Sequence, residues 1–260
     1  MFKLDNSFAR HSFTVTVVGC GGTGGFVAEG LCRLLPPQAG LVLIDHDRVE
    51  ERNLGRSNFK QSDLGKFKSE ALATRLAREY SRPVAYSTFP VALAEPKTPG
   101  LVIGCVDNGF ARRDIAAKVR PASCWWIDSG NGENYGQVII GNAPLRSLSS
   151  SFGEGICLAL PLPTIQRPEL LIQVPERRDC SSAVLAGEQG PTINQAMASL
   201  VLEVVRRLIE GVCSWMQLYL DLDAGTLSPV LAAPEIVEKI TGIKRRKLER
   251  RPAMKSQGGK

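Results

Sequence analysis

The stretch Val15–Gly25, VTVVGCGGTGG, decides how this chain folds. It opens with valine and threonine, which favour a buried strand, and it is followed by FVAEGLCRLL, which has a helical pattern. Gly19, Gly21 and Gly24 match G-x-G-x-x-G, in which the glycines permit a tight turn, close approach of a phosphate and close helix–strand packing. The sequence therefore predicts a strand, a tight turn and a helix whose first N–H groups face an anion, with a nucleotide as the natural ligand.

A carboxylate follows the next apolar run. Residues 41–44 are apolar and end at Asp45, about twenty residues after the glycines, where a dinucleotide-binding unit places an acid on a ribose hydroxyl. Asp45 could instead merely cap the loop after its strand, and glycine-rich turns also occur for purely structural reasons. No Lys-Ser or Lys-Thr follows the glycines, which excludes a P-loop.

Strand and helix patterns alternate along most of the chain. This order predicts an α/β, Rossmann-like fold with a mostly parallel sheet and helices on both faces. We expect helices over 67–80 and 192–210, and further strands in VAYSTFPVAL (84–93), LVIGCV (101–106), SCWWID and GQVIIG. A hairpin in WMQLYLDLDAGTLSPVL adds C-terminal antiparallel strands. No repeat or linker divides the chain, so residues 1–243 are expected to form a single domain.

Composition excludes several classes of protein. The chain has 260 residues, of which 43% are hydrophobic, and no apolar run reaches the roughly eighteen residues that span a bilayer. The start, MFKLDNSFARHSF, has no signal-peptide pattern, so we expect a cytoplasmic protein without a membrane partner. Seven scattered cysteines include no C-x-x-C pair, which indicates neither a zinc site nor a disulfide framework.

The positive charge is concentrated in the C-terminal tail. Residues 244–260 contain eight Lys or Arg and one Glu, a net +7, so the rest of the chain carries −1 of the total of +6. The tail is expected to be solvated or disordered, and contact with nucleic acid or an acidic partner is the alternative. The domain itself has no charge that favours nucleic acid.

Five motifs in order resemble the ThiF/MoeB/ubiquitin-activating (HesA/MoeB/ThiF) superfamily. The motifs are the glycine turn, DHDRVE (45–50), NLGR (53–56), GKFK (65–68) and CVDN (105–108). The resemblance covers Thr14 to about Val230, and DRV followed by NLGR is most similar to ThiF-like members of bacterial PRTRC gene systems. It implies an ATP-dependent adenylyltransferase that activates the C-terminal glycine of a small ubiquitin-like (β-grasp) protein. It also implies a homodimer.

The resemblance assigns roles to individual residues. Asp45 would bind the ribose, and Asp107 would hold Mg²⁺, a hard ion that prefers carboxylate oxygens. The nucleotide-binding set that it implies is Gly19, Gly21, Gly22, Gly24, Asp45, Asp47, Asn53, Arg56, Lys68, Asp107 and Asn108. These groups suit attack of a carboxylate on the α-phosphate of ATP, because two anions must be brought together and neutralised. Taken singly, Arg56 and Lys68 could be solvated surface charges, and Asp107-Asn108 could also cap a helix.

A cysteine completes the expected catalytic set. Cys180 ends the segment ERRDC in an expected crossover loop of about 156–180, and it resembles the cysteine with which ThiF-type enzymes handle sulfur or form a thioester. The adjacent Arg177 and Arg178 would lower its pKa. A purely structural role is the alternative. The expected catalytic residues are thus Arg56, Lys68, Asp107 and Cys180.

Two departures from the family pattern affect cofactors and partners. Bacterial relatives commonly carry two C-x-x-C pairs that bind zinc; this chain has none, so ATP and Mg²⁺ are expected without zinc. Relatives also donate an arginine from upstream of the glycines to the neighbouring subunit's ATP, and Arg10 is the available residue here.

Two other functions remain open. A nicotinamide-dependent oxidoreductase is permitted by the glycines and Asp45, although the cations between Asn53 and Lys68 favour a triphosphate. A non-enzymatic adaptor would keep the nucleotide pocket and only dock a ubiquitin-like partner.

Overall fold

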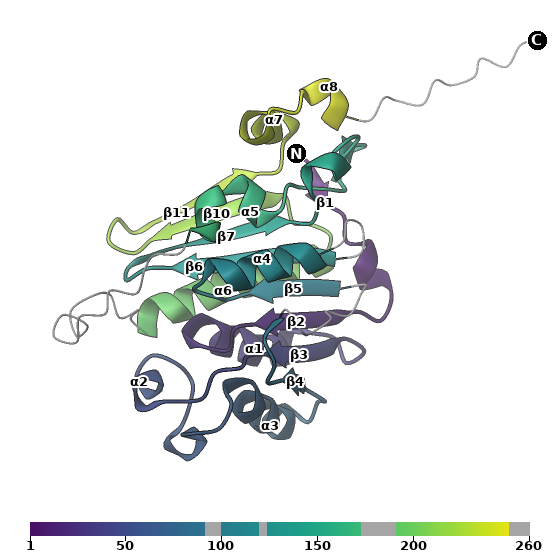
Figure 1. Ribbon diagram of the computed structural model, residues 1–260. Coiled ribbons are helices and arrows are strands. Elements are labelled where there is room, and N and C mark those ends of the chain that lie inside the picture. Colours follow the sequence, from purple (N-terminus) through teal and green to yellow (C-terminus); the bar gives the residue numbers. More distant parts are fainter. Residues whose placement is uncertain (92–99, 120–123, 173–190, 250–260) are drawn as a thin grey trace, which may run out of the picture.

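A computed structural model describes residues 1–91, 100–119, 124–172 and 191–249. Within them, one sheet has the strand order β11-β10-β7-β6-β5-β2-β3-β4 (Figure 1). Its strands are β2 (Thr14–Val18), β3 (Gly40–Ile44), β4 (Ala85–Ser87), β5 (Gly100–Gly104), β6 (Cys124–Asn131), β7 (Tyr135–Gly141), β10 (Trp215–Asp221) and β11 (Thr226–Leu231). Strands β4, β3, β2, β5 and β6 are parallel, whereas β7, β10 and β11 add antiparallel pairs. This order confirms the expected fold class.

Helices cover both faces of the sheet. Figure 1 shows α4 (Gly109–Lys118) in front of β5 and β6, with α6 (Pro191–Ile209) behind them. Buried residues of α1 (Gly22–Leu34), α3 (Lys68–Tyr80) and α6 belong to the same hydrophobic core. Helix α5 (Pro163–Gln166) packs beside α4. The longest of these helices, α6, buries an apolar stripe that includes Ile193, Met197, Val201 and Val204.

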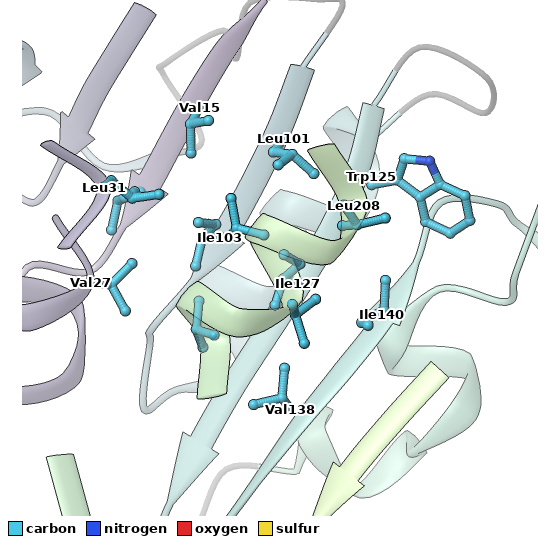
Figure 2. Packing of buried hydrophobic residues seen from close by; sticks show 14 of the residues in the cluster. Val15, Val27, Leu31, Leu101, Ile103, Trp125, Ile127, Val138, Ile140 and Leu208 are labelled. Carbon is cyan, nitrogen blue, oxygen red and sulfur yellow. The ribbon is translucent and has the colours of Figure 1, made fainter. Parts of the chain in front are cut away.

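The larger core lies between the sheet and α1 and α6. Because strand side chains alternate between faces, Trp125 and Ile127 point into this core while Trp126, between them, is buried on the α4 side. Figure 2 shows strand residues of this core, such as Ile103 and Val138, together with Leu31 of α1 and Leu208 of α6 from the same cluster. Each fully buried aliphatic side chain contributes roughly 1.5–3 kcal/mol, so this layer fixes the sheet that carries the site.

Several expected boundaries differ from the structure. Of the strand expected over 84–93, the structure forms only β4 within the part as far as residue 91. Residues 92 and 93 lie outside the described residues. The segment between β3 and α3 contains α2 (Glu51–Leu54) and the 3-10 turn η2 (Gln61–Asp63). The first residues form β1 (Lys3–Leu4) and η1 (Ser7–Arg10), and β1 joins a small sheet in the order β1-β9-β8.

The remaining elements lie after the parallel strands. They are η4 (Leu145–Ser147), β8 (Phe152–Gly153), β9 (Ile156–Cys157), η5 (Pro168–Leu171), α7 (Pro234–Thr241) and α8 (Arg245–Leu248). The tail 244–260 was expected to be solvated or disordered, but its first residues are folded against the domain. The side chain of Leu248 is fully buried, and Arg245 pairs with Glu235 at 2.5 Å, so the chain is ordered to residue 249. Residues 250–260 lie outside the described ones.

No helix in the described ranges is both long and apolar enough to cross a membrane.

Candidate active site

A cavity of about 1060 Å³ opens at the carboxyl ends of the parallel strands. Rossmann-like sheets bind their ligands at this edge. Ten of the residues expected to bind nucleotide line the cavity: Gly19, Gly21, Gly22, Asp45, Asp47, Asn53, Arg56, Lys68, Asp107 and Asn108. The fold thus brings together residues that are up to 89 positions apart in the sequence. Their roles at the nucleotide stay predictions.

The three motif glycines have different reasons for lacking a side chain. Gly19 has a φ of +87°, and a Cβ there would lie 2.4 Å from the carbonyl oxygen of Cys105. A Cβ on Gly24 would lie 1.9 Å from the Gly19 oxygen, so close helix–strand packing requires this glycine too. At Gly21, by contrast, a Cβ would meet no described heavy atom within 4 Å. Gly21 therefore leaves space on the cavity side of the turn, where a phosphate would approach.

This difference predicts separate effects for two substitutions. Gly21→Ala should keep the thermal midpoint within about 2 °C and weaken ATP binding at least about tenfold, because its methyl group occupies phosphate space. Gly24→Ala should lower the free energy of unfolding by about 1–3 kcal/mol through overpacking. Calorimetric titration with ATP and urea unfolding of both variants measure the two effects. Unchanged ATP affinity in a folded Gly21→Ala variant would contradict the assignment of this turn.

Asp45 is already held by backbone donors. Its Oδ2 accepts the N–H of Cys20 at 2.6 Å, and its Oδ1 accepts the N–H of Asp47 at 2.9 Å. Burial raises the pKa of Asp45 above its usual value, although these two hydrogen bonds oppose the shift. The capping role considered as an alternative is therefore present. Each carboxylate oxygen keeps a further lone pair that a ribose hydroxyl can reach.

Lys68 lies at the cavity wall in an ion pair with Asp47. Its Nζ is 2.9 Å from Asp47 Oδ2, and its backbone N–H donates to the Asp47 carbonyl at 2.8 Å. Partial burial acts to raise the pKa of Asp47, but the hydrogen bond and charge of Lys68, together with the nearby His46 and Arg52, bring this pKa below its usual value. Asp45, His46 and Asp47 cluster within 4.8 Å. Because both carboxylates already have partners, this cluster needs no metal ion.

Asn53 and Arg56 are placed by α2. The Oδ1 of buried Asn53 accepts the N–H of Glu50 at 2.9 Å, closing a capping box at the start of this helix. Half-buried Arg56 follows two residues after the helix and lines the cavity. Its guanidinium makes no ion pair with any of the described carboxylates. An unpaired cation at the wall suits a phosphate.

The expected double role of Asp107-Asn108 fits the geometry. Asn108 caps α4, because its Oδ1 accepts the N–H of Ala111 at 2.8 Å. Asp107 is exposed, lines the cavity and forms no ion pair within the described part of the chain. Its Oδ1 accepts one hydrogen bond from Asn108 Nδ2 at 3.4 Å, and the remaining lone pairs of this carboxylate suit Mg²⁺ beside the expected phosphates.

The cavity extends beyond the predicted residues, over the antiparallel strands. Gln137, Tyr219 and Ser228 lie directly opposite one another on β7, β10 and β11, and all three line it. Deeper in the wall, Arg112 Nε is 3.1 Å from both carboxylate oxygens of Asp128, and burial raises the pKa of this acid to about 6. No local motif in the sequence distinguishes these residues.

Two further residues, Cys180 and Arg10, were named from the resemblance. Cys180 lies outside the described residues. Arg10 is exposed in η1 and does not line the cavity of its own chain. Of the described thiols, that of Cys105 lines the cavity, but burial raises its pKa to about 12, so it is protonated at neutral pH and is a poor nucleophile.

Curated relatives share sequence with this chain. It is 28% identical over 216 residues to ubiquitin-like modifier-activating enzyme 5 of Gallus gallus, covering 76% of this chain and 51% of the relative. The protein of the same name from Drosophila willistoni is 34% identical over 138 residues, covering 46% and 34% of the two chains. The chain thus spans about a third to a half of the length of these relatives.

Solved structures share the fold. MccB of E. coli, in a structure with ATP, has a TM-score of 0.60 and 16% identity, covering 87% of this chain and 65% of MccB. PaaA has a TM-score of 0.58 and 18% identity, with coverage of 87% and 65%. Finally, the family model described as ThiF family matches residues 9–217, most of the chain. Because this match spans most of the chain, the chain belongs to the ThiF family.

Proposed function

We propose that the protein is an ATP-dependent adenylyltransferase that activates the C-terminal carboxylate of a small ubiquitin-like protein or a peptide. The observation that carries the proposal is the convergence on one cavity of an open glycine turn with an arginine and a carboxylate, Arg56 and Asp107, that make no ion pair among the described residues. The relatives' name and the MccB structures with ATP support the same activity. A nicotinamide enzyme has no comparable need for Arg56 and Lys68.

The cavity supplies two adjoining binding regions. In the first, the α1 N-terminus and Arg56 bind the phosphates, and Asp45 binds the ribose. Asp107 would hold Mg²⁺, which offsets negative charge on ATP when it is bound. In the second, the strip of Gln137, Tyr219 and Ser228 holds the polypeptide terminus, so that its carboxylate faces the α-phosphate. The hydroxyl of Ser129 also lines the cavity, is buried and has no partner among the described atoms, which suits a ligand there.

The finer assignments belong to the same proposal. We expect a homodimer, a cytoplasmic location, and a kinship with PRTRC-system ThiF-like proteins through DRV and NLGR. Cys180 would take part in any later thioester or sulfur transfer. Zinc is not part of the proposal because the chain lacks paired cysteines.

Nucleotide titration followed by an exchange assay tests the function. Calorimetry should show that ATP binds with Mg²⁺ and that NAD does not. Small proteins of the source cell that end in glycine should then support ATP–pyrophosphate exchange. Tight NAD binding without ATP binding would favour the oxidoreductase, and partner binding without exchange at any ATP concentration would favour the adaptor.

Arg56 and Arg52 provide a matched pair for the phosphate site. Arg56→Ala should weaken ATP binding by about 10- to 100-fold, because hydrogen bonds to charged groups contribute about 1.5–3 kcal/mol. Arg52→Ala removes the same charge from an exposed side chain that pairs with Glu50 at 2.6 Å, and should change the affinity less than about twofold. Calorimetry at two salt concentrations measures the ATP affinity of both variants. Equal losses in the two variants would show a general charge effect instead of a site.

A further inference from the structure

A buried amide joins the segments that form the phosphate side of the cavity. Asn194, in the first turn of α6, is fully buried. Its Nδ2 donates to the backbone carbonyl of Arg56 at 3.1 Å. Its Oδ1 accepts from Asn131 Nδ2 at 3.1 Å, and the Thr23 hydroxyl lies 3.1 Å from the same oxygen. The amide therefore links four segments that are distant in sequence.

Two of the linked segments carry the groups that we expect to bind phosphate. Thr23 is the second residue of α1 and follows Gly22, and both line the cavity. The Arg56 carbonyl belongs to the residue whose guanidinium is the unpaired cation. A Cβ on Gly22 would lie 2.3 Å from Asn194 Nδ2, so the amide packs directly against the glycine turn. The position of Asn194 thus sets the spacing between the turn's N–H groups and Arg56.

We propose that Asn194 is a positioning residue for the triphosphate. The inference rests on the proposed function, because it requires ATP in this cavity. Asn194 itself does not line the cavity; it acts through the backbone at Gly22 and Arg56. A displacement of about 1 Å between groups that grip one phosphate is enough to weaken its binding substantially. A buried, hydrogen-bonded side chain holds such a spacing because every alternative leaves polar groups without partners.

The structure offers a matched control for a purely structural asparagine. Asn142 is also buried; its Nδ2 donates to the Leu158 carbonyl at 3.0 Å, and its Oδ1 accepts the N–H of Leu160 at 3.0 Å. It does not line the cavity. Asn142→Ala should cost stability as Asn194→Ala does, and it should leave ATP affinity unchanged.

The experiment measures ATP and AMP affinity by calorimetry in wild type, Asn194→Ala, Asn142→Ala, Arg56→Ala and the Asn194→Ala/Arg56→Ala double variant. We expect Asn194→Ala to weaken ATP binding by about tenfold and AMP binding by less than about threefold. In the Arg56→Ala background the further loss should fall below about threefold, because the two residues act as one unit. If Asn194→Ala folds poorly, Asn194→Ser is measured instead; its shorter side chain leaves a polar group near Thr23 but does not reach the Arg56 carbonyl.

The outcomes separate this inference from the proposed function. If wild type binds ATP and Arg56→Ala weakens it, but Asn194→Ala matches Asn142→Ala, the positioning role is wrong and the nucleotide site stands. Full additivity of the two losses would also overturn the positioning role. If wild type does not bind ATP at all, the proposed function fails, and the positioning role fails with it.

Discussion

Asp107→Asn is expected to lower the rate of ATP–pyrophosphate exchange by at least about 100-fold, the loss typical of removing one group that stabilises developing charge. The substitution keeps the shape of the side chain and removes the charge that a hard cation needs. Asp107 is exposed to the cavity and has no ion pair in the described residues, so little of the fold depends on its charge. Binding of ATP without Mg²⁺ should be unchanged or slightly tighter, because a like charge near the phosphates is lost.

The measurement combines the exchange assay with calorimetric titration of ATP in the absence of Mg²⁺ and with Mg²⁺ in excess over ATP. Wild type should bind ATP more tightly with the metal, whereas Asp107→Asn should show no such gain. Asp223→Asn removes the same charge from a hairpin residue outside the cavity and serves as the control. A variant at 107 that keeps full exchange and full Mg²⁺ dependence would remove the metal assignment.

Arg75→Ala is expected to lower the free energy of unfolding by about 3–5 kcal/mol, the range for breaking a buried ion pair. Both Arg75 and Asp63 are more than nine-tenths buried, and Arg75 Nη1 is 2.7 Å from Asp63 Oδ2. Its Nη2 also donates to the carbonyl of Asn58 at 2.7 Å. Removal of the guanidinium takes this donor from the Asn58 carbonyl and leaves the buried Asp63 carboxylate with the N–H of Lys60 at 3.0 Å and the more distant Lys66 ammonium at 4.0 Å.

Urea unfolding gives the size of this effect. Arg33→Ala is the control, because Arg33 pairs with Glu29 on the surface of α1 and such pairs contribute about 0–1 kcal/mol. ATP affinity should also fall in Arg75→Ala. Arg75 holds the segment from Asn58 to Asp63, which begins two residues after Arg56, so its loss should loosen the position of Arg56. Similar stabilities of the two variants would mean that the segment is held by other contacts.

Local sequence was sufficient to predict the glycine turn and the order of the layers. Gly24 is explained within one strand–turn–helix unit, where a Cβ would strike the Gly19 oxygen, and Gly19 has a positive φ in the turn itself. The close approach of the Cys105 carbonyl to Gly19 comes from another strand and was not predicted. The alternation of apolar runs predicted the parallel strands, because strand and helix periodicity depend on neighbours in the chain. The expected strand over 84–93 was too long, since β4 is an edge strand whose length depends on its pairing with β3.

Other features of the site depend on contacts between distant segments. Lys68 was predicted to face phosphate, but its ion pair with Asp47 could not be read from the sequence. Nothing local predicted that Leu248 would be buried, and the tail was expected to be disordered from residue 244. Each case involves a partner that the chain brings near only by folding.

By itself, the sequence determined the strand–turn–helix unit, the fold class and the types of residue available for nucleotide chemistry. These follow from backbone geometry and from side-chain periodicity within about twenty residues. The tertiary structure alone decided which cations and carboxylates are free at the cavity and which are already paired, and it placed Asn194 between the glycine turn and Arg56. The reason is that burial and pairing are properties of separated segments in contact, whereas a motif records only neighbours along the chain.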